Sequence, residues 1–257
     1  ELSEVNVVTR KLGTMKLRTS VMNEDMISSA ELTRAACCNL GESFVTNPSV
    51  DVSYSDAATG AKQIKLLGLS GTYVQMMTEN IPNFRGAAAP YGLGYVPGPW
   101  MQSIQVSKGS SSVKNGYESI TGQINVEFKK PQLPEADWVS ANLFASSTNR
   151  YEANADATVK LSKRWSTSLL AHYENETKSH DSNDDGFVDI PRVEQYNVWN
   201  RWAYMGDHYV FQAGIKALHE TRNSGQIAHG NTPSHDLYEI GIKTNRYEAF
   251  TKNAYIF

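Results

Sequence analysis

Residues 151–162 alternate strictly between apolar and polar side chains, and this pattern constrains the fold more than any other feature of the chain. The odd positions run from Tyr151 to Leu161 through three alanines and a valine, while every even position is polar. Successive side chains of a strand point to opposite faces, so the segment is predicted to be a long β-strand with one apolar face.

The same alternation returns on both sides of this segment. Apolar residues share one face at 139–145, 165–173, 196–204 and 209–217, and a further strand is expected around 238–257. The connections 162–164 and 206–208 are short, whereas 178–192 and 222–237 are long and polar. Antiparallel strands with short turns at one edge, long loops at the other and bordering aromatic residues are typical of a transmembrane β-barrel. A soluble β-sandwich, whose strands also turn one face to a core, is the alternative.

Composition excludes several classes of protein. No stretch approaches the roughly 18 uninterrupted apolar residues of a transmembrane helix. A net charge of −3 with 20% charged residues argues against a nucleic-acid partner, since such proteins carry a clustered basic excess. Cys37 and Cys38 are adjacent, and adjacent cysteines rarely bridge each other, so we expect no disulfide and two small helix-packing residues. No catalytic motif is present, so we do not expect an enzyme.

The residues before Pro131 differ in pattern from those that follow. Short strand-like runs alternate there with glycine turns and one predicted helix, capped by Ser29 and running from Glu31 to Gly41. This mixture predicts a small α+β domain over 1–131, followed by the long strands over 135–257. The strand-like runs are 5–9, 20–27, 48–52, 64–67, 73–78, 104–106 and 123–129.

Several motifs in this domain occur in a fixed order. They are Glu4-Val5-Asn6-Val7-Val8-Thr9, the run from Leu40 to Val52, Ile64 to Leu69, Tyr73 to Pro82, Ile104 to Val113, Asn115-Gly116 and Ile120 to Val126. Together they resemble the plug domain of TonB-dependent outer-membrane receptors over about half of the chain. Three positions depart from the family pattern: Leu67 replaces an arginine, Glu79-Asn80 replaces Asp-Gly, and Gln123 replaces a glycine. Asn80 is still able to adopt the left-handed conformation that such a turn needs.

The resemblance implies an α+β plug domain followed by antiparallel β strands of a truncated transmembrane β-barrel. The family's barrels have about 22 strands, so a chain with room for six is expected to be part of a longer receptor. The implied function is TonB-dependent active transport of a scarce bulky nutrient, with an iron–siderophore or other metal chelate first, in the bacterial outer membrane. The implied partners are TonB, outer-membrane lipid and the ligand. A receptor that mainly signals to gene regulation and a soluble secreted β-sandwich that binds sugar or calcium are the alternatives.

The resemblance also suggests ligand-binding and TonB-binding residues. The glycine-, proline- and aromatic-rich segment 83–100 corresponds to the part of the plug that reaches the ligand. The ligand-binding candidates are Ser70, Thr72, Phe84, Arg85, Tyr91 and Tyr95. The alternative is that these residues pack the plug against the barrel. Residues 4–9 are the TonB-contact candidate, because an extended segment is able to add a strand to a partner's sheet, or else they form the first plug strand.

The segment 181–189 matches the first half of a calcium-binding loop. Its oxygen ligands occupy alternating positions, and Gly186 allows the sharp turn that the loop requires. The twelfth position is Arg192 where a bidentate glutamate is usual. We expect a divalent cation, with Ca²⁺ as the possible cofactor, or else a solvated acidic loop. The candidate ligands are Asp181, Asn183, Asp185 and Asp189.

Overall fold

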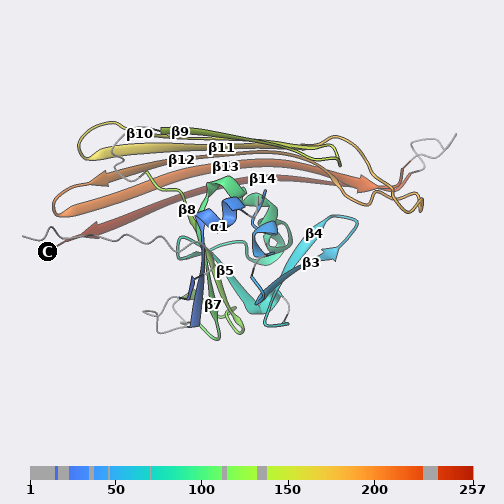
Figure 1. Ribbon diagram of the computed structural model, residues 1–257, viewed down its shortest axis with the longest axis horizontal. Coiled ribbons are helices and arrows are strands. Elements are labelled where there is room, and N and C mark those ends of the chain that lie inside the picture. The colour runs from blue at the N-terminus through green and yellow to red at the C-terminus, as the bar shows by residue number, and fades with distance from the viewer. Residues whose placement is uncertain are drawn as a thin grey trace, which may run out of the picture.

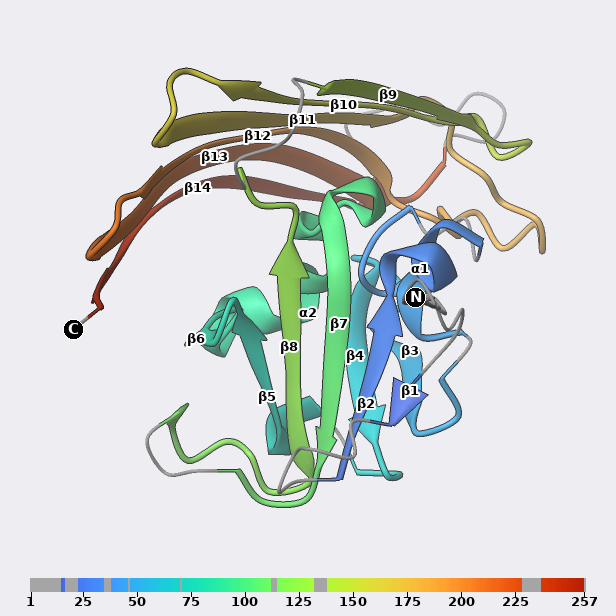
Figure 2. The ribbon, with the colours of Figure 1, turned by 60° about the vertical axis from the view of Figure 1, so that its left-hand side comes forward.

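Two sheets stand against each other in the computed structural model, which describes residues 15–16, 23–34, 38–45, 47–69, 71–111, 115–131, 138–227 and 237–256. A broad curved sheet forms one layer, called the wall below, and a smaller mixed domain, called the plug, lies against its concave face (Figures 1 and 2). The predicted α+β domain followed by antiparallel strands is confirmed.

The wall contains six antiparallel strands in which each pairs with its neighbour in sequence. They are β9 (Trp138–Ala145), β10 (Arg150–Lys160), β11 (Trp165–Glu176), β12 (Arg192–Met205), β13 (Tyr209–Gly225) and β14 (Glu239–Tyr255). The predicted loop start at Arg222 is wrong, because β13 and β14 stay paired up to Gly225 and Glu239. The apolar alternation that marked the strand stops near Ala217, but the backbone ladder continues beyond it.

The polar face of the wall is the buried one. On β10 the even positions Glu152, Asn154, Asp156 and Thr158 are all buried beneath the plug. Most apolar side chains of the wall point away from the plug, and Leu143 and Ile215 are 82% and 70% exposed. Leu170, Trp199 and Leu218 are exceptions that pack into the apolar core of the plug. A β-sandwich buries its apolar face between layers, so the sandwich alternative is wrong. An apolar outer face with a polar inner face is the pattern of a membrane barrel.

Aromatic residues border this outer face in two rows. Trp165 and Tyr204, with ring centroids 5.2 Å apart, lie near the end of the wall that carries the turns 161–164 and 206–208, called the short-turn end below. Tyr173 and Tyr196, 5.0 Å apart, lie toward the opposite end, which carries the connections 177–191 and 226–238 and is called the loop end. From Tyr196 to Tyr204 is roughly 26 Å along β12 at about 3.3 Å per residue. This spacing matches the apolar band of outer-membrane barrels, which is about 25 Å tall.

The plug is built on a second six-stranded sheet, in the order β1-β2-β7-β8-β5-β6. Its strands are β1 (Met15–Lys16), β2 (Asn23–Ser28), β5 (Val74–Thr78), β6 (Ile81–Pro82), β7 (Met101–Lys108) and β8 (Gly122–Phe128), and β3 (Val50–Asp56) forms a separate hairpin with β4 (Ala61–Leu66). The core of the plug is apolar: Ile27, Trp100, Ile104, Ile124 and Val126 have no measurable exposure. Here the apolar face points inward, opposite to the wall.

The helices of the plug are short. They are α1 (Ser29–Arg34), α2 (Ala89–Gly92), and the 3-10 helices η1 (Glu42–Phe44), η2 (Gly71–Tyr73), η3 (Gly86–Ala88), η4 (Leu93–Tyr95) and η5 (Gly98–Trp100). Among the described residues, none is long and apolar enough to span a membrane.

The predicted helix from Glu31 to Gly41 is wrong in both its cap and its length. The hydroxyl of Ser28, not Ser29, accepts the hydrogen bond from the Glu31 backbone nitrogen at 3.4 Å. Beyond α1, the Cys38 carbonyl accepts from Gly98 and the Leu40 nitrogen donates to Val96, so this stretch pairs with another segment instead of continuing a helix. Cys38 therefore lies outside α1, and Cys37 lies outside the described residues.

The departures from the family's turn motifs are accommodated locally. Glu79 and Asn80 have φ of +51° and +64°, so the predicted left-handed turn is confirmed, and it joins β5 to β6. Gly122 has φ of +157°, and an added Cβ would lie 2.1 Å from the Ser107 carbonyl oxygen, so a side chain is excluded at this position. The tight approach of β8 to β7 thus depends on the first glycine of the motif and tolerates Gln123.

Candidate functional site

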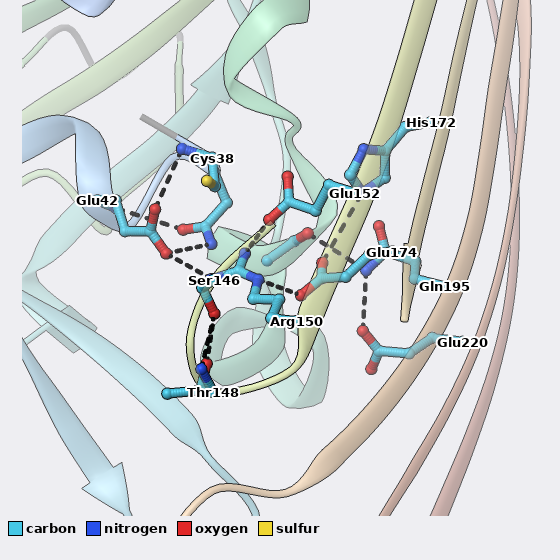
Figure 3. Close-up of polar contacts among 12 residues, drawn as sticks. Cys38, Glu42, Ser146, Thr148, Arg150, Glu152, His172, Glu174, Gln195 and Glu220 are labelled. Atoms are coloured by element: carbon cyan, nitrogen blue, oxygen red, sulfur yellow. Dashed lines mark hydrogen bonds and ion pairs between the residues drawn. The ribbon is translucent and has the colours of Figure 1, made fainter. Parts of the chain in front are cut away.

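The inner face of the wall meets the plug through charged side chains. Toward the loop end, Arg150 at the start of β10 contacts three carboxylates, from Glu42 at 2.9 Å, Glu152 at 2.7 Å and Glu174 at 2.9 Å. Glu42 belongs to the plug and the other two belong to the wall, so this loop-end cluster connects the two bodies (Figure 3). His172 extends it, lying 3.7 Å from Glu174 and 2.8 Å from Asn154.

The plug side of this cluster is organised by Glu42. Its carboxylate accepts hydrogen bonds from the Cys38 backbone nitrogen at 3.1 Å and from the Asn39 amide at 2.9 Å. Burial opposes ionisation of Glu42, but the charge and hydrogen bond of Arg150 outweigh it, and the pKa of the carboxyl is lowered. Burial, followed by the charges of Glu152 and Glu42, raises the pKa of the Cys38 thiol. Cys38 is therefore a protonated, unreactive thiol at neutral pH.

A cavity opens beside this cluster at the loop end, and we call it the loop-end cavity. It is lined from the plug by Tyr54, Lys62 and Tyr91 and from the wall by Glu176, Gln195 and Arg222. Arg222 closes one side, since its guanidinium donates to the Thr59 carbonyl at 3.2 Å and lies 5.5 Å from the Tyr91 ring centroid. The tip of the β3–β4 hairpin and the segment before η4 are thereby held against the wall.

A second ionic cluster, called the short-turn cluster, fixes the opposite side of the plug. The guanidinium of Arg201 lies 2.6 Å from one oxygen of Glu79 and donates to the other at 2.9 Å. Lys252 adds a second cation at 3.2 Å from the Glu79 carboxylate. The side chains of Arg201 and Glu79 are 1% and 3% exposed. Removing either partner of so buried a pair would leave an uncompensated charge.

Between the two clusters, the wall binds the plug main chain. The Tyr95 carbonyl accepts hydrogen bonds from the Asn197 amide at 3.0 Å and from the Lys216 ammonium at 3.1 Å. The Gln195 amide donates to the Gly94 carbonyl at 3.3 Å. The plug is thus held to the wall by hydrogen bonds and ion pairs at several heights.

The structure separates the six predicted ligand-binding residues. Tyr91 lines the loop-end cavity. Phe84 and Tyr95 are 4% and 2% exposed with ring centroids 6.5 Å apart, so both pack in the interior. Arg85 pairs with Glu118 at 2.7 Å, on the side of the β7–β8 connection and away from the cavity.

The remaining candidates stay predictions. Thr72 is exposed in η2, and Ser70 lies outside the described residues, as does the TonB-contact candidate from Glu4 through Val5, Asn6, Val7 and Val8 to Thr9.

The predicted calcium ligands accept hydrogen bonds from their own loop. Asp181 accepts from the Gly186 nitrogen at 2.9 Å, Asp185 accepts from Phe187 at 2.9 Å, and Asp189 accepts from Ser182 at 2.7 Å. Within the described part of the chain, no group of three or more His, Cys, Asp or Glu side chains is placed to hold a metal ion. The loop is closed by these hydrogen bonds, and the calcium site stays a prediction.

The wall residues of the site were missed at the sequence level, although a signal for them existed. Arg150, Glu174, Gln195, Arg201 and Arg222 all project from the face opposite the apolar stripe. Charged residues on that face indicate that it meets polar groups and not lipid. Their partners in the plug are far away in sequence, so the sequence pattern alone does not predict which residues pair.

Comparisons with known proteins agree with this arrangement. A family model described as the TonB-dependent Receptor Plug Domain matches residues 16–123. Similar solved structures include the siderophore receptor PiuA from Acinetobacter baumannii, FpvA of P. aeruginosa bound to heterologous pyoverdines, and the copper transporter OprC. Their TM-scores are 0.62, 0.69 and 0.65, with sequence identities of 15%, 14% and 13%. A search of curated proteins found no match.

The matches cover 79%, 92% and 92% of this chain but 27%, 32% and 35% of the three solved chains, so the sequence spans about a third of their length. Identities this low show a shared fold, whereas the family model identifies the plug itself. Residues 16–123 are therefore a TonB-dependent receptor plug domain, and the antiparallel wall that follows shares its fold with the corresponding part of these solved receptors.

Proposed function

We propose that this chain belongs to a transporter that carries a metal chelate, an iron–siderophore first, across the bacterial outer membrane with energy supplied through TonB. The observation that carries the proposal is the polarity of the wall: its apolar face points outward and its charged face holds the plug. A lipid-facing barrel that encloses a plug needs this inversion. The names of the similar structures refer to siderophores, pyoverdines and copper, which supports a chelate as the ligand class.

The nature of the plug–wall contact suits a plug that must move. The contact combines an apolar patch, where Trp199 packs against Trp100 and Phe128, with many hydrogen bonds and ion pairs that water is able to replace as the plug separates. An apolar interface of the same size would lose its stabilisation outright on hydration. In our proposal the ligand binds at the loop end, and TonB pairs with residues 4–9 as an added strand and pulls on the plug from the other side.

Calorimetry on the full-length receptor in detergent tests this proposal. The panel comprises ferric siderophores, copper chelates, haem, cobalamin and oligosaccharides. We expect saturable binding of a metal chelate, weakened about tenfold or more by Tyr91→Ala, since Tyr91 lines the loop-end cavity. Arg85→Ala is the matched control, because Arg85 is paired with Glu118 outside the cavity. Binding of oligosaccharide alone, or chelate uptake by cells that is unaffected by deleting residues 4–9, would overturn the proposal.

A further inference from the structure

We propose that the loop-end cavity binds a cationic nitrogen of the transported ligand, a primary ammonium or a guanidinium, with Glu176 and Gln195 as its acceptors. The inference rests on the proposed function, because it assigns a chemical class to the ligand of that same cavity. Three observations carry it: an unpartnered amide oxygen, an unpartnered carboxylate and an excess of negative charge.

The amide of Gln195 is fixed with its oxygen unused. Gln195 is 1% exposed, and its nitrogen donates to the Gly94 carbonyl at 3.3 Å and to Glu220 at 2.9 Å. Those two bonds set the orientation of the amide, and its oxygen has no hydrogen-bond partner among the described residues. A buried acceptor without a donor is costly, so the site is more stable when a ligand supplies an N–H group.

Glu176 supplies the second acceptor. It is 7% exposed, stands at the end of β11 and lines the cavity. Within the described part of the chain, its carboxylate has no hydrogen bond and no ion pair within 4 Å, and it interacts at longer range with the charges of Arg150, His180 and Arg222. Glu174 stands directly opposite Gln195 in the strand register, so Glu176, two residues further on the same face, is the diagonal neighbour of Gln195. Diagonal neighbours lie about 7–8 Å apart, which one nitrogen with two or three N–H donors is able to bridge.

The charge of the surroundings also selects a cation. Among the described residues, five carboxylates lie in or beside the cavity, from Glu42, Glu152, Glu174, Glu176 and Glu220, against three cations, from Lys62, Arg150 and Arg222. His172 and His180 lie beside Glu174 and Glu176, so the excess of negative charge is at most two. Arg150 pairs with three of the carboxylates and Arg222 with Glu220 at 3.2 Å, and neither forms an ion pair with Glu176. A ligand that brings positive charge restores the balance.

The lining favours an organic cation over a bare metal ion. The carboxylates in and beside the cavity come from η1, β10, β11 and β13, and no three of them are placed to hold a metal among the described residues. Tyr54 and Tyr91 add aromatic rings to the lining, and Tyr91 already lies beneath the guanidinium of Arg222 at 5.5 Å. Aromatic faces stabilise ammonium and guanidinium groups that have left water.

A matched pair of ligands tests the inference on the full-length receptor in detergent. The probes are the ferric complex of a linear trihydroxamate that ends in a primary amine and the same complex with the amine acetylated. We expect the amine form to bind at least about tenfold more tightly, and Glu176→Gln to abolish that preference. Glu194→Gln is the matched control, since Glu194 bonds to Tyr196 on the outer face, and it should retain the preference.

Butylammonium chloride and calcium chloride, each tested by thermal shift, separate the possible failures. If the trihydroxamates bind equally with and without the amine, the inference is overturned while the transport proposal stands. If neither complex binds, stabilisation by butylammonium that is lost in Glu176→Gln still supports the cation site, and its absence overturns it. A Glu176-dependent response to calcium alone would replace it with a metal site.

Discussion

The plug sheet and the wall sheet both alternate apolar and polar side chains, but the plug buries its apolar face and the wall exposes it. In the plug, β7 and β8 bury Ile104, Val106, Ile124 and Val126 at 0% exposure. In the wall, equally apolar residues such as Val139 and Ile215 are 80% and 70% exposed, while Arg201 and Glu220 are each 1% exposed. The comparison teaches that alternation identifies a strand, whereas the medium around the sheet decides which face is buried.

The plug and the wall meet mainly through polar groups, beside an apolar contact of Trp199 with Trp100 and Phe128. Arginines of the wall pair with acceptors of the plug. Arg150 and Arg201 form ion pairs with Glu42 and Glu79, and Arg222 donates a hydrogen bond to a main-chain carbonyl. The plug is therefore stabilised by its apolar core, and the wall by the backbone hydrogen bonds between its strands. Ion pairs then hold the plug against the wall.

The largest expected effect is a charge placed in the plug core. Ile104→Asp puts a carboxylate at a position with no exposure, between β2 and β8. We expect a loss of about 5 kcal/mol or more, because a buried charge without a partner is among the most destabilising changes. Protease resistance of the plug against urea concentration measures it. Gln102→Asp, at an exposed position of the same strand, should change stability by about 0.5 kcal/mol or less. Equal effects would mean that β7 does not face a core.

Breaking the short-turn cluster should rank next. Arg201→Met removes the principal cation from Glu79, and we expect plug docking to weaken by about 3–5 kcal/mol, because the carboxylate remains buried. Adding Glu79→Gln to Arg201→Met should recover a large part of that loss. A double-mutant cycle in urea measures the coupling. Independent, additive losses would show that the two side chains do not act as a pair.

Charging the outer face of the wall should cost less and depend on position. Ile215→Arg places a charge between the two aromatic rows, where we expect a loss of about 2–4 kcal/mol in a lipid bilayer. Asn223→Arg lies on the same face of β13 beyond the rows, so we expect about 0–1 kcal/mol. Unfolding of the full-length receptor in liposomes gives both values. If Ile215→Arg left the free energy of unfolding unchanged, it would contradict the lipid-facing assignment, since exposed positions in water tolerate arginine.

The sequence was sufficient to predict the strands but not the way in which the plug and the wall dock. The wall strands were predictable because each repeats a period of two, and the Glu79-Asn80 turn because its residue types favour positive φ. The helix beyond Arg34 was overpredicted, because Leu40 uses its backbone to pair with Val96, a tertiary contact that no local pattern encodes. The cavity was unpredictable for the same reason, since the residues that line it come from both bodies.

A weaker effect is expected from pH at the loop-end cluster. The folded-state pKa of Glu42 is lowered, so its contribution is complete above the unfolded value of about 4.3 and is lost as pH falls through the folded value. The side chain is 34% exposed, so we expect only about 0.5–1 kcal/mol. Urea midpoints of the wild type and Glu42→Gln should differ at pH 6 and converge toward pH 3. A difference that grows on acidification would refute the sign, and Glu239→Gln serves as the surface control.

The calcium loop is expected to give the smallest effect. Its hydrogen bonds already close the loop, so an ion would add charge neutralisation more than order. We predict a dissociation constant of about 10⁻⁴–10⁻³ M, in the range of weak calcium modules, and hence about 1.4 kcal/mol of stabilisation at ten times that concentration. Calorimetry with calcium chloride tests this in Asp185→Asn, which should bind more weakly, against Asp184→Asn, which lies between ligand positions and should not. If both variants bind as the wild type does, the acidic side chains serve the loop's own backbone, and the resemblance to a calcium loop reflects turn geometry alone.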